Sequence, residues 1–226
     1  MRITETAVPG AFVLTPHHIV DARGAFYESF RVESLEAAIG TPFRPEQVNF
    51  SVSAANTLRG LHGVAVPPGQ AKLVTCVRGA LRDMVVDLRV GSPTFGVFAG
   101  TLLEAGTGTS VYIPPGVMHG FLALTDDTCI SYVLSTAHVP GTQIDINPLD
   151  PALGLPWGFT SPPLMSDKDT HAPDVATALA AGLLARWDEV SSAAQLDAAA
   201  HAEVRGLVVG DAGEHAGGHA VQRRDT

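Results

Sequence analysis

Short apolar runs, separated by Gly, Pro, Asn and Asp, fill the chain from Ile3 to about Asp169. Apolar and polar residues alternate in part of this stretch, as around Asp87, and turn signals such as 90–93 recur about every ten residues. This rhythm predicts an antiparallel β sandwich or barrel. The clearest expected strands are Ala71–Val77, Leu81–Leu88, Thr94–Leu103, Ser110–Ile113 and Cys129–Leu134.

The pattern predicts few helices, and most of them follow Pro173. A short helix is expected over Ser34–Ala38. A longer one is expected over Asp174–Trp187, where Ala and Leu recur at helical spacing and Asp174 can cap the first turn. A further helix is expected over Ser192–Val204, and the Gly-, His- and Ala-rich stretch 206–226 is expected to be disordered. We therefore divide the chain into a domain over 1–187 and a helical or disordered extension over 188–226.

Composition excludes several classes of protein. Hydrophobic residues make up 46% and charged residues 16%, enough to bury a core, and the net charge of -9 argues against a nucleic-acid surface. No apolar run is long enough to span a membrane, and the amino terminus lacks a basic-then-apolar signal. We expect a soluble, cytoplasmic protein. Cys76 and Cys129 are expected to be reduced, although the sequence leaves a disulfide between them open.

The basic residues are distributed unevenly between the two types. Only Lys72 and Lys168 are lysines, against twelve arginines. Either each retained lysine has a specific task, or the bias reflects a GC-rich genome and the two survive by chance.

Three clusters place ionisable side chains at the ends of apolar runs, where a β scaffold presents functional groups. They are 59–62 with Lys72, then 113–121, and 166–169. The second contains the Pro-Gly-x-x-His form of the second metal motif of cupin barrels. The companion His-x-His pair and glutamate are absent, because Gly63 and Val64 follow His62. Three or four such ligands are needed, so no metal is expected.

Each of these residues also has a plain structural interpretation. A single His62 could be a satisfied core or surface histidine, Lys72 a strand residue with a buried stem, and Tyr132 a packing aromatic. His215 and His219 could bind a metal, but a solvated tail is the simpler interpretation. The combination of residues, and its order along the chain, decides between these readings.

From about residue 3 to 187 the chain resembles the dTDP-4-dehydrorhamnose 3,5-epimerase family, with many matches in family order and spacing. The resemblance implies an all-β cupin or jelly-roll fold, a double-sheet sandwich with short flanking helices, and a homodimer that exchanges amino-terminal strands. The matching segments are 21–28 (DARGAFYE), 47–51 (QVNFS), 58–62 (LRGLH), 72–74 (KLV), Gly79, 87–96 (DLRVGSPTFG), 113–116 (IPPG), 119–121 (HGF), Tyr132 and 166–169 (SDKD).

The implied activity is epimerisation of a dTDP-4-keto-6-deoxyhexose such as dTDP-4-keto-6-deoxyglucose, at C3, C5 or both, without a cofactor. Protons beside a ketone are acidic because their loss gives an enolate, which a base, an opposed acid and a cation can exploit. By resemblance His62 is the base, Asp169 orients its imidazole, Lys72 faces the ketone oxygen and Tyr132 is the proton donor on the opposite face. Imidazole suits a base at cellular pH, and a phenol is protonated at rest.

The resemblance also assigns substrate contacts. Arg23 and Arg59 face the pyrophosphate, whose oxygens suit guanidinium groups. The remaining implied contacts, to the nucleotide and the sugar, are Glu28, Gln47, Asn49, His119 and Lys168.

Three positions depart from the family pattern. His138 stands where a tyrosine commonly stacks on thymine, Gln143 stands where glutamate is usual, so that a charge is lost, and Gly63 replaces an aromatic and is expected to leave space beside the base. These changes could alter the sugar accepted or the carbons inverted. Three alternatives stay open: a single-site 3- or 5-epimerase of an antibiotic-sugar pathway, a metal cupin using His62 and His119, and a non-catalytic sugar-nucleotide-binding protein.

Overall fold

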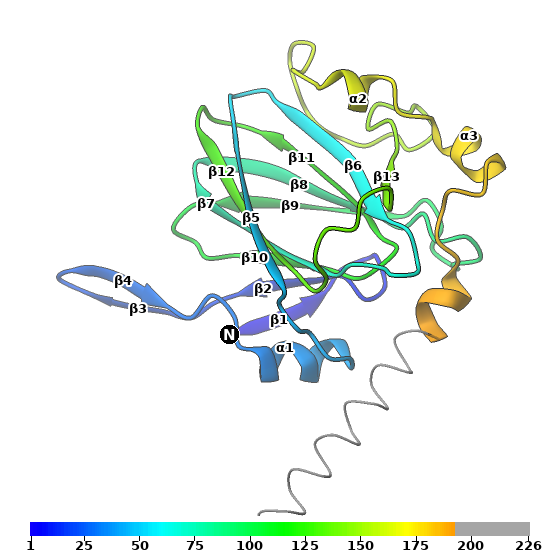
Figure 1. Cartoon of the computed structure of the whole chain (residues 1–226). Coiled ribbons are helices and arrows are strands. Elements are labelled where there is room, and N and C mark those ends of the chain that lie inside the picture. The colour runs from blue at the N-terminus through cyan, green and yellow to red at the C-terminus, as the bar shows by residue number, and fades with distance from the viewer. Residues whose placement is uncertain (193–226) are drawn as a thin grey trace, which may run out of the picture.

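Two antiparallel sheets stack face to face in the computed structural model, which describes residues 1–192 (Figure 1). The all-β sandwich expected from the sequence is confirmed. The first sheet has six strands in the spatial order β1 (Arg2–Glu5), β2 (Phe12–Thr15), β10 (Ser110–Ile113), β7 (Lys72–Arg78), β12 (Thr128–Leu134) and β5 (Gln47–Ser53). The second has five, in the order β13 (Gln143–Asp145), β6 (Leu58–Val64), β11 (Met118–Ala123), β8 (Ala80–Val86) and β9 (Phe98–Glu104).

The main core lies between the two sheets. Residues of both inner faces interdigitate there, as expected for a sandwich. Val74 and Ile130 come from the six-stranded sheet, whereas Val85, Leu103 and Phe121 come from the five-stranded sheet, and all five are at most 1% exposed.

Each sheet also buries much of its outer face. Helix α1 (Val32–Ile39) covers the six-stranded sheet and places Leu35 among Leu14, Leu73 and Tyr112. The chain after β13, including α2 (Asp167–Thr170) and α3 (Val175–Ala180), follows the five-stranded sheet, where Trp157 and others form a second outer cluster. Strand β8 is therefore buried on both faces, so alternation along it is weak.

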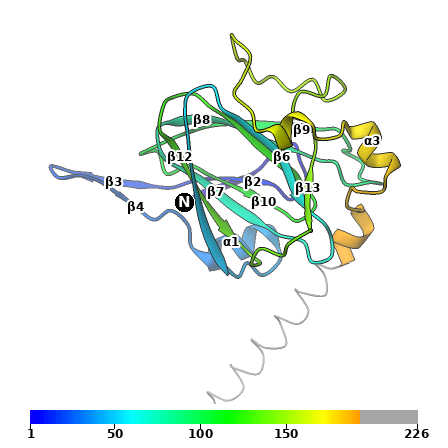
Figure 2. The same cartoon turned by 45° about the horizontal axis from the view of Figure 1, so that its top comes forward.

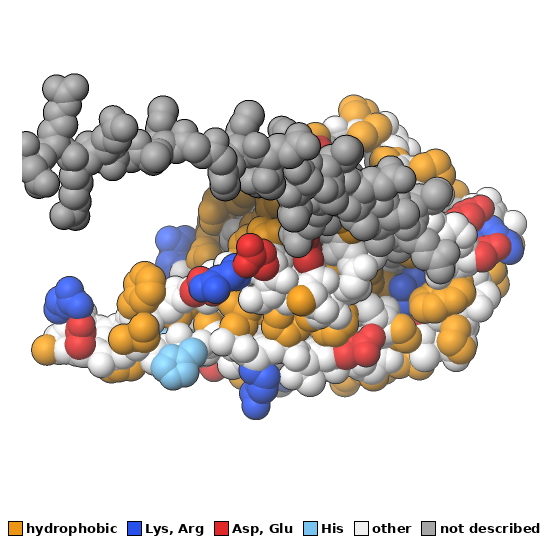
Figure 3. All heavy atoms as spheres, turned by 90° about the horizontal axis from the view of Figure 1, so that it is seen from below, with side chains coloured by type: hydrophobic (Ala, Val, Ile, Leu, Met, Phe, Trp, Pro, Cys, Tyr) orange, Lys and Arg blue, Asp and Glu red, His pale blue; other side chains and the backbone are white. Residues whose placement is uncertain are grey.

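A two-stranded hairpin, β3 (His18–Asp21) and β4 (Gly24–Tyr27), projects from the sandwich (Figures 1 and 2). Its apolar side chains are open to solvent: Ile19, Val20 and Phe26 are each more than 60% exposed. Figure 3 shows hydrophobic side chains along this projection. Within a single chain these side chains do not pack into a core.

The expected strands agree with observed strands to within a few residues, and the first helix is longer than expected. The helix expected over Asp174–Trp187 is wrong beyond Ala180. Asp174 does cap α3 by accepting from the N–H of Thr177 (2.7 Å), but Gly182 then adopts φ 67° and ends it. The chain next pairs with Val90 through Arg186, and residues 187–192 are again helical.

Several other expectations concern the ends of the chain and its thiols. Both cysteines are free. No helix among residues 1–192 is long and apolar enough to cross a membrane. Val190 is buried, so packing continues past 187, and the boundary at 187/188 remains a prediction. The helix expected over 192–204, apart from its first residue, and His215 and His219 lie outside the described residues.

Candidate active site

A cavity of about 370 Å³ opens at one end of the sandwich. One wall comes from β5, β7 and β12 of the six-stranded sheet, and the other from β6 and β13 of the five-stranded sheet. The residues predicted from the sequence that line it are Gln47, Asn49, His62, Lys72, Tyr132, His138 and Gln143.

An irregularity in β6 turns two predicted residues toward the same side. His62 pairs with His119 and Arg59 with Phe121, so three steps along β6 match two along β11. Such a bulge changes which residues share a face. Both side chains consequently point toward the six-stranded sheet, where Arg59 Nε donates to Ser53 Oγ (3.0 Å). Gly60 lets β6 and β11 approach closely here, because a Cβ on residue 60 would lie 2.6 Å from Gly120 Cα.

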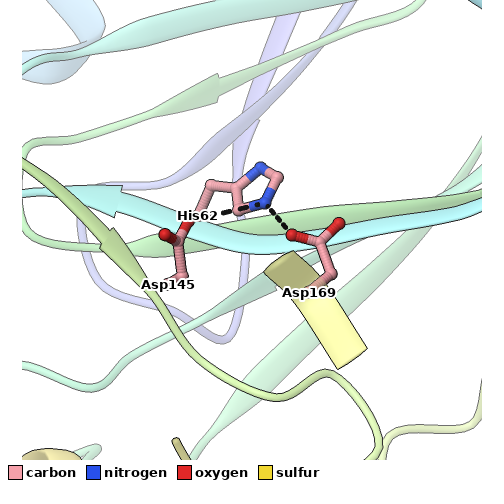
Figure 4. Close-up of side chains that lie close together, drawn as sticks. All are labelled: His62, Asp145 and Asp169. Carbon is pink, nitrogen blue, oxygen red and sulfur yellow. Dashed lines mark hydrogen bonds and ion pairs between the residues drawn. The ribbon is translucent and has the colours of Figure 1, made fainter. Parts of the chain in front are cut away.

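The imidazole of His62 lies between two carboxylates (Figure 4). Its Nε2 donates to Asp169 Oδ1 (2.7 Å) and lies 3.6 Å from Asp145 Oδ1. Asp169 is buried in α2, and burial alone would raise its pKa. The bonds from His62, from the Gly60 N–H and from Ser166 outweigh burial and hold the pKa of Asp169 below its usual value.

This contact selects the tautomer of His62. A carboxylate accepts but cannot donate, so the proton of the neutral ring sits on Nε2. No described residue hydrogen-bonds to Nδ1. Nδ1 therefore carries the free lone pair that a general base needs.

Lys72 occupies the cavity wall beside His62. Its Nζ donates to the backbone carbonyl oxygen of His62 (3.3 Å). Burial lowers the pKa of Lys72 to about 8, and the negative charge of Asp145 opposes that fall. At neutral pH the side chain is therefore mostly an ammonium group, held where little water screens it.

Tyr132 stands on β12, on the same wall as Lys72 and across the cavity from His62. Burial raises the pKa of its phenol to about 12, partly offset by its hydrogen bond with Ser51 (3.3 Å). The phenol is thus protonated at neutral pH and can donate a proton.

His119 lies deeper than the other predicted residues. It is 3% exposed, its Nε2 donates to Asp83 Oδ2 (2.5 Å), and its ring meets that of Tyr132 edge-on at 6.2 Å. It is not among the residues that line the cavity. In this structure it supports Tyr132 from behind.

The mouth of the cavity is polar. Gln47 Nε2 donates to Asn49 Oδ1 (2.8 Å), and the His138 N–H donates to Gln47 Oε1 (2.9 Å). Gln143 Nε2 donates to Asp145 Oδ1 (2.7 Å). The amide at position 143 thus contacts a carboxylate two residues further along the same face of β13.

Lys168, Arg23 and Glu28 lie outside the cavity lining. Lys168 reaches Asp145, with Nζ 3.0 Å from Oδ1. Arg23, at the tip of the β3–β4 hairpin, is 90% exposed and paired with Asp21, and Glu28 is paired with Arg31. Within one chain the β3–β4 hairpin, which carries Arg23 in its turn and is followed by Glu28, projects away from β6 (Figure 1).

Gly63 lines the cavity beside His62, but the volume that a side chain at this position would enter is already occupied. A Cβ on Gly63 would lie 2.5 Å from Met118 Sδ. Met118 is 2% exposed and fills that volume. The backbone of Gly63 thus forms part of the cavity wall, and the flexible end of Met118 fills the volume beyond it.

Sequence reasoning missed three polar partners: Asp83, Asp145 and Ser51. Ser51 lies within a segment that carried the family resemblance, but nothing in the pattern assigned it a partner. Asp83 was detectable as one of two acidic residues, with Asp87, in the mainly apolar run Leu81–Leu88. Asp145 had no local signal.

His62, Asp145 and Asp169 offer ligand atoms that all lie within 4.8 Å of one another. A metal ion would favour such a set. Here the Lys168 ammonium already balances Asp145, and Lys72 adds a second positive charge nearby. The arrangement suits a metal-free site, which remains a prediction.

Comparison with known proteins assigns the family. The family model of dTDP-4-dehydrorhamnose 3,5-epimerase matches residues 5–177. A dTDP-4-dehydrorhamnose 3-epimerase from Streptomyces niveus is 45% identical over 184 residues, covering 81% of this chain and 88% of that protein. A dTDP-4-dehydrorhamnose 3,5-epimerase from Mycolicibacterium smegmatis is 43% identical over 187 residues, covering 83% and 92%.

Solved structures agree. The rmlC epimerase of Mycobacterium tuberculosis superimposes with a TM-score of 0.85 at 40% identity, covering 87% of this chain and all of that one. A 3'-monoepimerase from Streptomyces bikiniensis, solved with dTDP-quinovose, gives 0.82 at 42% identity, covering 85% and 98%. With this likeness over most of both chains, the protein belongs to the dTDP-4-dehydrorhamnose 3,5-epimerase family of sugar-nucleotide epimerases.

Proposed function

We propose that this protein epimerises a dTDP-4-keto-6-deoxyhexose beside its ketone, using its own side chains and no metal or cofactor. One observation carries the proposal: His62 and Tyr132 line facing walls of one cavity, with Lys72 beside them. A base, an opposed acid and a cation are the three groups that inversion through an enolate requires.

The reaction begins with proton removal. Nδ1 of His62 takes the proton from the carbon next to the ketone, and its electron pair moves into the enolate. The ring becomes an imidazolium ion, which Asp169 stabilises through the bond to Nε2 (2.7 Å). Asp169 also keeps the ring in the tautomer that leaves Nδ1 free.

The enolate oxygen is stabilised by Lys72, whose ammonium charge is strong in a poorly hydrated site. Tyr132 then donates its phenolic proton to the opposite face of the same carbon, and the configuration inverts. Before the next turnover the phenolate regains a proton from solvent and the imidazolium of His62 releases its proton to solvent. A donor with a pKa of about 12 suits protonation of a basic carbon.

Double epimerisation, at C3 and C5, is our default assignment. Single inversion at C3 is the second candidate, because relatives from Streptomyces niveus and Streptomyces bikiniensis, at 45% and 44% identity, are named 3-epimerases. Relatives named 3,5-epimerases lie within a few per cent of the same identity. The level of identity therefore does not separate the two.

Substrate contacts follow the polar mouth of the cavity. Gln47, Asn49, His138 and Gln143 line it and are proposed to contact nucleotide and sugar. Arg59 does not line the cavity of the free chain; its side chain lies against β5, and its expected contact with the pyrophosphate remains a prediction. The expected roles of Lys168 and His119 in sugar binding remain predictions, since neither lines the cavity of the free chain.

A homodimer would complete the site. Val48, Phe50 and Val52, on the outward face of edge strand β5, are each more than half exposed, as are the apolar residues of the hairpin. Exposed apolar rows beside an open sheet edge favour association. We propose that the hairpin of one protomer covers β5 of its partner and brings Arg23 and Glu28 to the partner's cavity.

The deciding experiment is proton NMR of dTDP-4-keto-6-deoxyglucose incubated with the protein in heavy water. Loss of both the C3 and the C5 proton signals, with new product couplings, supports the 3,5-epimerase. Loss of the C3 signal alone supports the second candidate. Binding without exchange at either carbon would contradict the catalytic proposal and favour a sugar-nucleotide-binding protein.

A further inference from the structure

Asp145 lies directly opposite His62 in the pairing of β13 with β6. Its Oδ1 lies 3.6 Å from His62 Nε2, 3.0 Å from Lys168 Nζ and 2.7 Å from Gln143 Nε2. The side chain is 23% exposed. One carboxylate oxygen therefore faces the base, a lysine and a residue of the cavity mouth at once (Figure 4 shows the first of these).

The charge of this carboxylate acts on both lysines of the chain. Lys168 forms an ion pair with it, and the pKa of Lys72, lowered by burial, is supported by its charge. One carboxylate therefore acts on Lys72, the cation proposed to lie near the enolate oxygen, and on Lys168, at the edge of the cavity.

We propose that Asp145 is a positioning residue of this active site. Its carboxylate fixes the side chains of His62, Lys168 and Gln143 relative to one another. The inference rests on the proposed function, because its kinetic consequence follows from His62 acting as the base. Asp145 is not proposed to touch the reacting carbon.

The physical role follows from the surrounding charges. The titratable groups around His62 are Asp169 from α2, Asp145 from β13, Lys72 from β7, Tyr132 from β12 and its cross-strand partner His119 from β11, and Lys168 from α2 reaches Asp145. When the ring of His62 takes a proton, Asp145 helps Asp169 to stabilise the new positive charge. Without Asp145, the two lysines would repel the imidazolium ion with one anion fewer to offset them.

Position 143 offers a test of whether the negative charge of Asp145 or its location is what matters. Gln143 and Asp145 are two residues apart and share a face of β13. Moving the negative charge from position 145 to position 143 keeps it on the same face of β13. It no longer lies at the position that pairs with His62. Asp145→Asn removes the charge at nearly constant shape, and Asp145→Asn/Gln143→Glu relocates it.

The first measurement is the deuterium exchange rate of dTDP-4-keto-6-deoxyglucose as a function of pH. For Asp145→Asn we expect kcat to fall about tenfold near neutral pH with a smaller change in KM. Because Lys72 would lose its proton at lower pH, the ratio of the rate at about pH 9 to that at about pH 7 should fall about threefold further. The relocated charge should restore this ratio at least in part.

A general loss of structure would lower the rate equally at every pH. A wild-type pH profile and kcat in Asp145→Asn, or a uniform fall that Asp145→Asn/Gln143→Glu does not change, would overturn the proposal.

The second measurement does not need activity. Carbon-13 labelling of lysine side chains gives signals from Lys72 and Lys168 alone, which Lys168→Arg assigns. In Asp145→Asn the Lys72 titration should move to lower pH and the Lys168 signal should lose its ion-pair shift. Unchanged titrations of both lysines would overturn the proposal. If the wild-type protein shows no exchange, the proposed function fails, and these titrations still decide whether Asp145 organises the cluster.

Discussion

His62 and His119 are direct partners across β6 and β11, and each has its own carboxylate, Asp169 for the first and Asp83 for the second. Only His62 lines the cavity, because His119 is buried behind Tyr132. Two adjacent histidine–aspartate pairs thus have different surroundings, one open to a ligand and one enclosed in the sandwich. Because of this difference His62 is suited to act as a base, whereas His119 supports Tyr132.

His62→Asn should lower proton exchange at every carbon that the wild-type enzyme exchanges, by about a thousandfold, because the general base is lost. Heavy-water NMR measures this directly. His17→Asn, which alters an exposed histidine, is the matched control and should leave exchange unchanged. Undiminished exchange in His62→Asn would rule out the assigned base.

Tyr132→Phe should retain exchange but impair inversion. His62 can still remove the proton and return deuterium to the same face, whereas the opposite face has no donor. We expect inverted product to fall about a hundredfold more than exchange does. Comparing deuterium incorporation with product couplings in one NMR time course tests this. Equal losses of both would contradict Tyr132 as the donor.

Activity should decline as the pH rises through about 8, because Lys72 loses its proton there. The sign follows from burial, which lowers the pKa of a lysine by destabilising its charged form. Lys72→Arg keeps a positive charge, so its lower activity should not show this decline. A pH–rate profile from about pH 6 to about pH 9.5 measures both. The same decline in Lys72→Arg would assign it to another group.

Phe50→Glu should convert a dimer to monomers, since it places a charge in the exposed apolar row of β5. Light scattering after size exclusion measures the mass. Leu164→Glu, at a similarly exposed apolar residue away from β5 and the hairpin, should leave the dimer intact. A monomeric wild-type protein would refute the proposed assembly.

Gly63→Ala should destabilise the fold by about 1–3 kcal/mol, because its Cβ would overlap Met118. Thermal unfolding measures the change. The double variant Gly63→Ala/Met118→Val, with a shorter side chain opposite, should regain part of the loss. No change in Gly63→Ala would show that Met118 adjusts without strain.

Much of the fold was readable from local pattern. Strand β10 was predicted residue for residue, and β7, β8 and β12 to within one or two residues at each end, because apolar runs and turn residues mark them directly. The helix expected over Asp174–Trp187 failed because Gly182 and the pairing of Arg186 with Val90 override its composition. Backbone pairing with a distant segment has no local signal.

By itself the sequence determined the alternation of strand and turn, the ordered motifs of the family, and the ionisable groups available for chemistry. Only the tertiary structure decided which groups meet. The bulge in β6 placed Arg59 and His62 on one side, and β13 brought Asp145 to His62 and Lys168. The reason is physical: side-chain direction follows residue number only while a strand is regular, and contacts between distant segments depend on how the sheets pack.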